Sequence, residues 1–154
     1  MVKFNSNSPL SPKEEAVGLA GCDAYEKGDF LGAIDLFKKA ARIGRTNSWY
    51  VNIGNIYADH LVPPQPDKAV HYYRLGVRTD AMAAYALAVH YYWKDEARWQ
   101  RYWLDRAVEM GQEDARERFS DHKKRFKRKL AALRIARQNE RDAATVSPVK
   151  RPPR

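Results

Sequence analysis

Residues 11–44 read SPKEEAVGLAGCDAYEKGDFLGAIDLFKKAARIG, and they contain the pattern that decides the fold. Apolar residues recur at steps of three and four, first from Ala16 to Tyr25 and then from Phe30 to Ala40. This spacing places the apolar side chains on one face of an α-helix. The stretch therefore predicts two consecutive amphipathic helices, separated by a turn at Gly28-Asp29.

The ends of these two helices carry residues that are typical of helix caps. Ser11 can cap the first helix, Pro12 suits its first turn, and Glu14 can reach back to complete a capping box. Gly44 is expected to end the second helix, as glycine often does. Structure is therefore predicted to begin at residue 11, whereas residues 1–10 are polar, lack periodicity and are expected to form a flexible lead.

The same pair of helices recurs twice along the chain. The second pair has Ile53, Gly54 and Tyr57 on its first helix, and the third pair runs through Leu87 and Tyr91 to Gly111. Nowhere does an apolar–polar alternation of useful length indicate a strand. We therefore predict an all-α fold, a short helical-hairpin solenoid of about three repeats of roughly 34 residues.

The repeat resembles the tetratricopeptide and Sel1-like families of helical repeats over roughly residues 14–116. The residues of the first pair that stand at the tetratricopeptide spacing are Gly21, Ala24, Tyr25, Gly28, Asp29, Phe30, Ala33, Ile34, Phe37 and Ala40. In the second pair Trp49-Tyr50 and residues 53–57 look like the first-helix motif, and residues 107–115 resemble the Sel1-like link. The resemblance implies a repeat domain at residues 11–115, in which the first helix of each pair lines a concave face.

That concave face would be neutral and aromatic. The residues expected to line it as a protein-binding groove are Tyr25, Asn52, Asn55, Tyr85, Tyr92 and Trp93. Such a lining suits an apolar or amphipathic segment of a partner protein. One subgroup of the family grips a carboxylate with a basic clamp, but here only Asn52 matches that clamp, which argues against binding of a chaperone tail.

Positive charge is concentrated in the last quarter of the chain. Residues 116–154 contain 14 Lys or Arg against 4 Asp or Glu, whereas residues 1–115 contain 14 against 15. A basic block of this kind indicates contact with an anionic partner. The class of partner stays open at this point: RNA or DNA comes first, an acidic protein second and an anionic membrane surface third.

The basic block is predicted to form a long amphipathic helix at residues 116–142, followed by a disordered tail at residues 143–154. An apolar stripe from Phe119 to Leu133 is expected to cap the last helix pair, with the first half of the helix packed and the second half projecting. The residues expected to contact nucleic acid or an acidic partner are Arg116, Arg118, Lys123, Lys124, Arg125, Lys127, Arg128, Lys129, Arg134 and Arg137.

These features favour a non-enzymatic adaptor that binds a protein through its repeats and an anionic partner through its basic helix. The alternative is an RNA- or DNA-binding protein in which the helix and an aromatic–basic region at residues 93–106 form one site. In that region Trp93 and Tyr102 are the expected surface contacts, whereas Trp99 and Trp103 are expected to pack between helices.

The sequence offers little for catalysis. Its four histidines lack the spacing of a metal site, its single Cys22 has no evident base nearby, and phosphate-binding or dinucleotide motifs are absent. We therefore expect no enzyme activity, no catalytic residue, no metal and no cofactor. With neither a secretory signal nor a membrane segment in the sequence, the expected location is the cytoplasm, or the nucleus if the source is eukaryotic.

Overall fold

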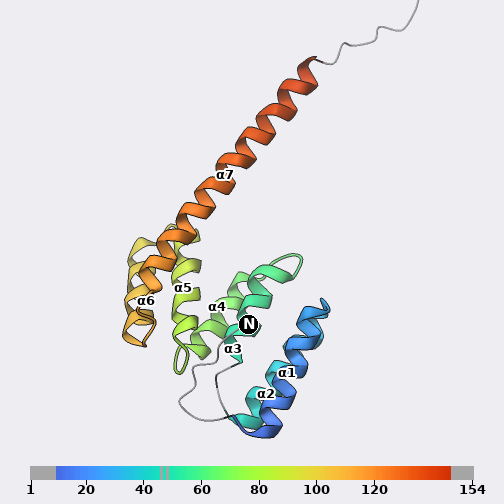
Figure 1. The fold of residues 1–154 in the computed structure, drawn as a ribbon, viewed down its shortest axis with the longest axis vertical. Coiled ribbons are helices and arrows are strands. Elements are labelled where there is room, and N and C mark those ends of the chain that lie inside the picture. The colour runs from blue at the N-terminus through green and yellow to red at the C-terminus, as the bar shows by residue number, and fades with distance from the viewer. Residues whose placement is uncertain (1–9, 46, 48, 147–154) are drawn as a thin grey trace, which may run out of the picture. The chain divides into compact units, whose positions relative to one another are not determined.

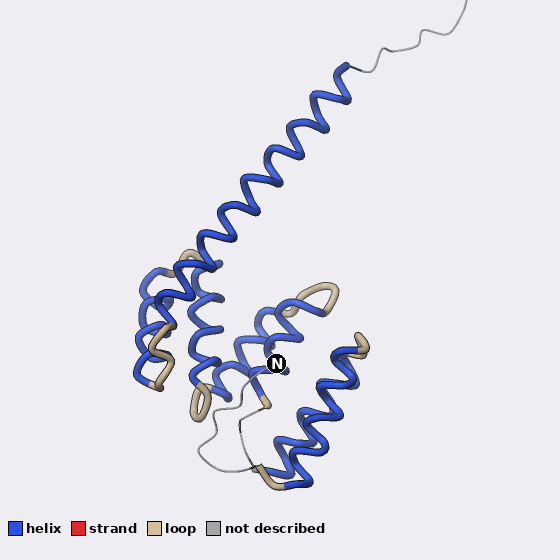
Figure 2. The backbone as a smooth tube through the Cα atoms, in the orientation of Figure 1, coloured by secondary structure: helices blue, strands red, loops and turns tan. Residues whose placement is uncertain are grey.

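All the secondary structure in the described part of the chain is helical. The structure is a computed structural model, and it describes residues 10–45, 47 and 49–146. The chain divides into two compact units, residues 1–115 and residues 116–154. Figure 2 shows helices and loops but no strand among the described residues, which confirms the prediction of an all-α chain.

The first two helices are α1 (Pro12–Glu26) and α2 (Phe30–Gly44), as predicted from residues 11–44 (Figure 1). The Ser11 side chain caps α1 by accepting a hydrogen bond from the Glu14 backbone N–H at 3.2 Å. Between the helices, Gly28 has a φ of +79°, a conformation that glycine adopts easily. The two helices approach closely at Gly21, where an added Cβ would lie 2.8 Å from the Phe37 ring.

The Glu14 side chain has a contact that the sequence did not predict, because it reaches into the core. It is 1% exposed, and its Oε1 accepts a 3.0 Å hydrogen bond from Nε1 of the buried Trp49. Gly44 makes room for it, since a Cβ on Gly44 would collide with the Glu14 carboxylate. As predicted, α2 ends at Gly44, and the residue that follows it, Arg45, has the left-handed φ of 51° and caps the helix.

The second pair consists of α3 (Tyr50–Asn55), a π-helical turn η1 (Ile56–His60) and α4 (Pro66–Gly76). Gly54 lets α3 and α4 pack closely, because a Cβ there would collide with the ring of Tyr73 on α4. Prolines follow η1, and Pro66 occupies the first turn of α4, where a missing N–H is tolerated.

The third pair is α5 (Ala81–Trp93) and α6 (Ala97–Glu109), which pack closely on each other. Asp80 caps α5 by accepting a 2.8 Å hydrogen bond from the Met82 backbone N–H. Contacts of α2 with α3 and of α4 with α5 join successive pairs. The three pairs thus share a core, in which Leu87 and Tyr91 of α5 belong to the same cluster as Phe37 and Trp49.

The described part of the second unit belongs to α7 (Ala115–Val146), a single helix of 32 residues that begins at the last residue of the first unit. At 1.5 Å per residue it is about 48 Å long. Phe119 is buried, but Leu130 and Leu133 are 37% and 48% exposed. The prediction that one apolar stripe is covered from Phe119 to Leu133 is therefore wrong for its second half.

Two predicted boundaries near the ends of the chain differ from the structure. Leu10, assigned to a flexible lead at residues 1–10, packs against the core cluster, while residues 1–9 lie outside the described part. Residues 143–146, assigned to a disordered tail, continue α7, because the run Ala143-Ala144 has high helix propensity. Residues 147–154 lie outside the described part.

Candidate functional site

All the basic residues predicted to bind an anionic partner lie on α7. Each of them is exposed except Lys123, which is half-buried. The helix contains 11 Lys or Arg against 4 Asp or Glu. This excess of basic side chains gives α7 a strong positive potential toward any anion.

Five of the basic residues form a single row along α7. At 3.6 residues per turn, the members of this row lie within about 40° of one another around the helix axis. We call them the basic row: Arg116, Lys123, Lys127, Arg134 and Arg141. The row extends over about 38 Å. Because it is regular and one-sided, it can follow a polyanion along its length.

The acidic residues of α7 lie mainly on the other side of the helix from the basic row. Glu117, Asp121 and Asp142 are about 60–160° away from it, and Lys124, on the same side as these acids, pairs with Asp121 at 3.3 Å. Lys124 is thus partly neutralised by a neighbour. Within the row, Lys123 places its Nζ 5.7 Å from the centroid of the Phe119 ring. A cation over an aromatic face can still bind an anion on its open side.

The predicted groove residues of the first two pairs take part in two separate contacts. The Tyr25 hydroxyl lies 2.7 Å from Nε2 of His60, and the Tyr25 and His60 rings meet edge to face. The Tyr73 hydroxyl donates to Oδ1 of Asn55 at 2.9 Å. Burial, followed by the nearby Asp59 carboxylate, raises the pKa of Tyr73 well above its usual range. The hydroxyl therefore stays a donor at any working pH.

The remaining groove residues show different degrees of exposure. Asn52 on α3 and Tyr85 and Tyr92 on α5 are half-buried, whereas Trp93 at the end of α5 is 47% exposed. Trp93 and Tyr92 have ring centroids 5.4 Å apart. These two residues form a local aromatic pair. The hydrogen bonds of Tyr25 and Asn55 involve neither Tyr92 nor Trp93.

A cluster of exposed aromatic and basic side chains lies on α6. Trp99 and Tyr102 are 46% and 52% exposed, with ring centroids 5.8 Å apart, and Arg98 and Arg106 fall on the same side of the helix. Trp99 was predicted to pack between helices, and it does so only in part: its ring lies 6.1 Å from the Tyr91 ring of α5, but its other side is exposed. Trp103 is the residue that packs inward, since it lies against both core clusters.

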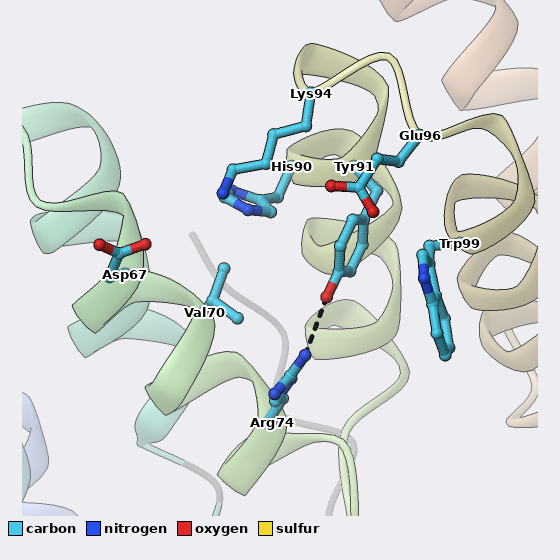
Figure 3. A pocket seen from close by; sticks show the side chains of 8 residues that line it. All are labelled: Asp67, Val70, Arg74, His90, Tyr91, Lys94, Glu96 and Trp99. Carbon is cyan, nitrogen blue, oxygen red and sulfur yellow. Dashed lines mark hydrogen bonds between the residues drawn. The ribbon is translucent and has the colours of Figure 1, made fainter.

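A pocket that the sequence did not predict lies between α4 and α5, with a volume of about 360 Å³. In Figure 3, Asp67, Val70 and Arg74 project from α4, and Arg74 donates to the Tyr91 hydroxyl at 2.9 Å. The rest of the lining comes from α5, from the turn after it and from α6: His90, Tyr91, Lys94, Glu96 and Trp99. In the sequence, the only indication of this pocket is the i, i+3, i+7 spacing of Asp67, Val70 and Arg74, which places their side chains on one face of α4.

The charges around this pocket are balanced, with two carboxylates and two cations. Burial, followed by the nearby Lys94, lowers the pKa of His90, although Asp67 and Glu96 act in the opposite direction. The environment of this pocket therefore favours the neutral form of His90. Burial also raises the pKa of the Cys22 thiol, so this cysteine is less nucleophilic than a free one.

The described residues contain neither a metal-binding cluster nor a membrane-spanning helix. Within that part of the chain, no group of three or more His, Cys, Asp or Glu side chains is arranged to hold a metal ion. Nor is any helix there long and apolar enough to cross a membrane.

Comparison with known proteins leaves the chain without an assigned family. No protein-family model matches it, and no curated protein matches its sequence significantly.

Proposed function

We propose that this protein is a non-enzymatic binding adaptor. The helix pairs at residues 11–115 act as a short solenoid of the tetratricopeptide or Sel1-like kind and bind a protein or peptide segment. The long basic helix α7 binds an anionic macromolecule, either a nucleic acid or an acidic protein. No cofactor or metal takes part, and the expected location is the cytoplasm or, in a eukaryote, the nucleus.

One observation carries the proposal: the exposed basic row of α7. A helix that is merely kept soluble usually mixes charges in pairs of opposite sign along one face. In the basic row, five positive side chains follow one another without an acidic residue between them on that side of the helix. The like charges of the row repel one another, and binding of an anionic partner relieves this repulsion.

A salt titration tests this part of the proposal. Full-length protein is titrated with duplex DNA, with single-stranded RNA and with polyglutamate between about 50 and 200 mM salt. If the basic row neutralises five phosphates, the log–log salt slope should be about −4.5 on duplex DNA and about −3.5 on a single strand.

The matched variant has all five residues of the basic row replaced by glutamine. Glutamine keeps the helix propensity and removes the charge, so binding should weaken strongly without a loss of helical signal in circular dichroism. Absence of binding to all three polyanions at low salt would contradict the proposed role of α7.

A second candidate function is nucleic-acid binding by both units. It is favoured by the exposed Trp93, Trp99 and Tyr102 near Arg98 and Arg106, because bases stack on such rings at about 1–3 kcal/mol each. Replacing Trp99 and Tyr102 by alanine separates the two candidates. A loss of affinity for single-stranded RNA favours this second function, whereas unchanged affinity favours the adaptor.

The protein-binding half of the proposal is tested at Tyr85 and Tyr92 on α5. Both are half-buried on the helix expected to line the groove. In Tyr85→Ala and Tyr92→Ala variants, capture of the protein partner should weaken, while the unfolding transition should stay cooperative. Unchanged capture would remove this surface from the proposed groove.

A further inference from the structure

The second half of α7 has exposed leucines that binding to phosphates does not require. Leu130 and Leu133 are 37% and 48% exposed, and together with the half-buried Phe126 they follow steps of four and three residues. This narrow stripe corresponds to successive d, a and d positions of a coiled-coil heptad. We call these three residues the α7 seam.

Basic residues flank the α7 seam on both sides. In the same heptad register, Lys127, Arg134 and Arg141 fall at the e positions and Lys129 at the preceding g position. In coiled coils, the e and g positions lie beside the seam and their charges select the partner helix. Three of these four residues also belong to the basic row, so the charge on α7 is placed where it borders an apolar contact.

This arrangement distinguishes among the anionic partners. A second copy of α7 would bring the same basic e and g residues against their equivalents, and the like charges would repel. A helix that lies in a membrane needs a broad apolar face, yet the α7 seam is one residue wide and the exposed Ile135 lies on another side. A nucleic-acid backbone would leave Leu130 and Leu133 in water.

We propose that α7 docks an acidic amphipathic helix of another protein. Apolar side chains of the partner pack on Leu130 and Leu133, and its Glu or Asp residues pair with Lys127, Lys129 and Arg134. This inference rests on the proposed function, in which α7 binds an anionic macromolecule, and it names the class of that macromolecule. Because the seam is short, the complex is held by charge and apolar contact together, and high salt should weaken it.

The experiment uses the full-length protein and two synthetic peptides of identical composition. The first peptide has leucine at a and d and glutamate at e and g over about three heptads. The second has the same residues in an order without a heptad pattern. The first should bind measurably tighter in fluorescence anisotropy, since both carry the same charge but only one has an apolar stripe.

The discriminating variant is Leu130→Ala/Leu133→Ala, and the matched control is Ile135→Ala. Alanine preserves the helix, and all three positions are exposed, so each variant should fold as the parent does. The double variant should bind the first peptide about tenfold more weakly, because it loses apolar contact area. The control should bind as the parent does, and both should keep the parent's affinity for duplex DNA.

Two results would overturn the inference: equal affinity for the two peptides, or parental affinity of the Leu130→Ala/Leu133→Ala variant for the first peptide. If duplex DNA binds and neither peptide does, the inference fails while the role of α7 in binding an anion stands. If neither peptide nor DNA binds at low salt, the proposed role of α7 fails as well.

Discussion

Glu14 and Trp49 are joined by a buried hydrogen bond, in which the indole Nε1 donates to the Glu14 carboxylate at 3.0 Å. The bond connects the first turn of α1 with the residue that precedes α3, 35 positions later in the chain. Trp49 also stacks on Phe37 with ring centroids 5.7 Å apart. The first two helix pairs are therefore held together by one aromatic residue and the acid that satisfies its polar atom.

Replacing Glu14 by alanine should destabilise the protein by about 1–3 kcal/mol, since the buried indole N–H loses this acceptor. The matched control is Glu15→Ala, which removes the same side chain from an exposed neighbouring position. The control should change the free energy of unfolding by less than about 0.5 kcal/mol. Urea unfolding followed by circular dichroism measures both, and equal midpoints would contradict the role assigned to Glu14.

Gly18 should tolerate no larger residue as long as Trp49 is present. A Cβ on Gly18 would collide with the six-membered ring of the Trp49 indole, so Gly18→Ala should destabilise by about 1–3 kcal/mol despite the better helix propensity of alanine. In a Trp49→Leu background the same substitution should be much less harmful. A double-mutant cycle of unfolding free energies measures this coupling, and additive effects would show that the two residues act independently.

The side of α7 that contacts a polyanion can be identified with two variants of equal charge. Lys127→Gln/Arg134→Gln changes the basic row, whereas Lys124→Gln/Arg128→Gln changes the side that also carries Asp121. If the row makes the contacts, the first variant should reduce the magnitude of the salt slope on duplex DNA by about 1.8. The second should leave the slope nearly unchanged. An equal reduction by both would indicate that only the net charge of α7 matters.

His90 should make the stability of the protein depend on pH. Burial and Lys94 lower its pKa in the folded state below the usual 6.5, so the unfolded chain binds a proton more readily. The contribution of neutral His90 is thus fully present above about pH 6.5 and is lost as the pH falls below that value. Between pH 7 and pH 5 the parent should lose more stability than His90→Gln, in which residue 90 cannot titrate.

Nuclear magnetic resonance can check the same relationship directly. A titration of the His90 ring protons should give a pKa below 6.5. Parallel stability curves of the parent and the His90→Gln variant would contradict the expected shift, whatever the contribution of the other titratable groups.

Local sequence patterns predicted the helices because each one depends mainly on its own residues. The recurrence of apolar side chains at three and four residues placed α1, α2, α5 and α6 correctly. The charge asymmetry likewise predicted α7 and its basic residues, since it is a property of consecutive positions. The buried hydrogen bond of Glu14 was not predicted, because its partner Trp49 is distant in the sequence.

The exposure of side chains was the hardest property to predict for the candidate sites. Trp99 and Leu133 stand at the same spacing as true core residues, yet both are nearly half exposed. An apolar stripe in the sequence shows which residues share a face of a helix. Whether that face is covered depends on the surrounding packing. For this reason the α7 seam and the aromatic side of α6 could not be recognised from periodicity alone.

By itself, the sequence determined that the chain is helical, where its helices begin and end within a few residues, and that α7 is basic. These properties arise from short-range periodicity, caps and composition, which act within one or two turns. The tertiary structure alone decided that Glu14 and Trp49 meet in the core, that Asp67 and Arg74 face His90 and Tyr91 across a pocket, and that Leu130 and Leu133 stay exposed. Each of these depends on which surfaces the folded chain brings together and which it leaves uncovered, and such long-range contacts are not specified by the spacing of neighbouring residues.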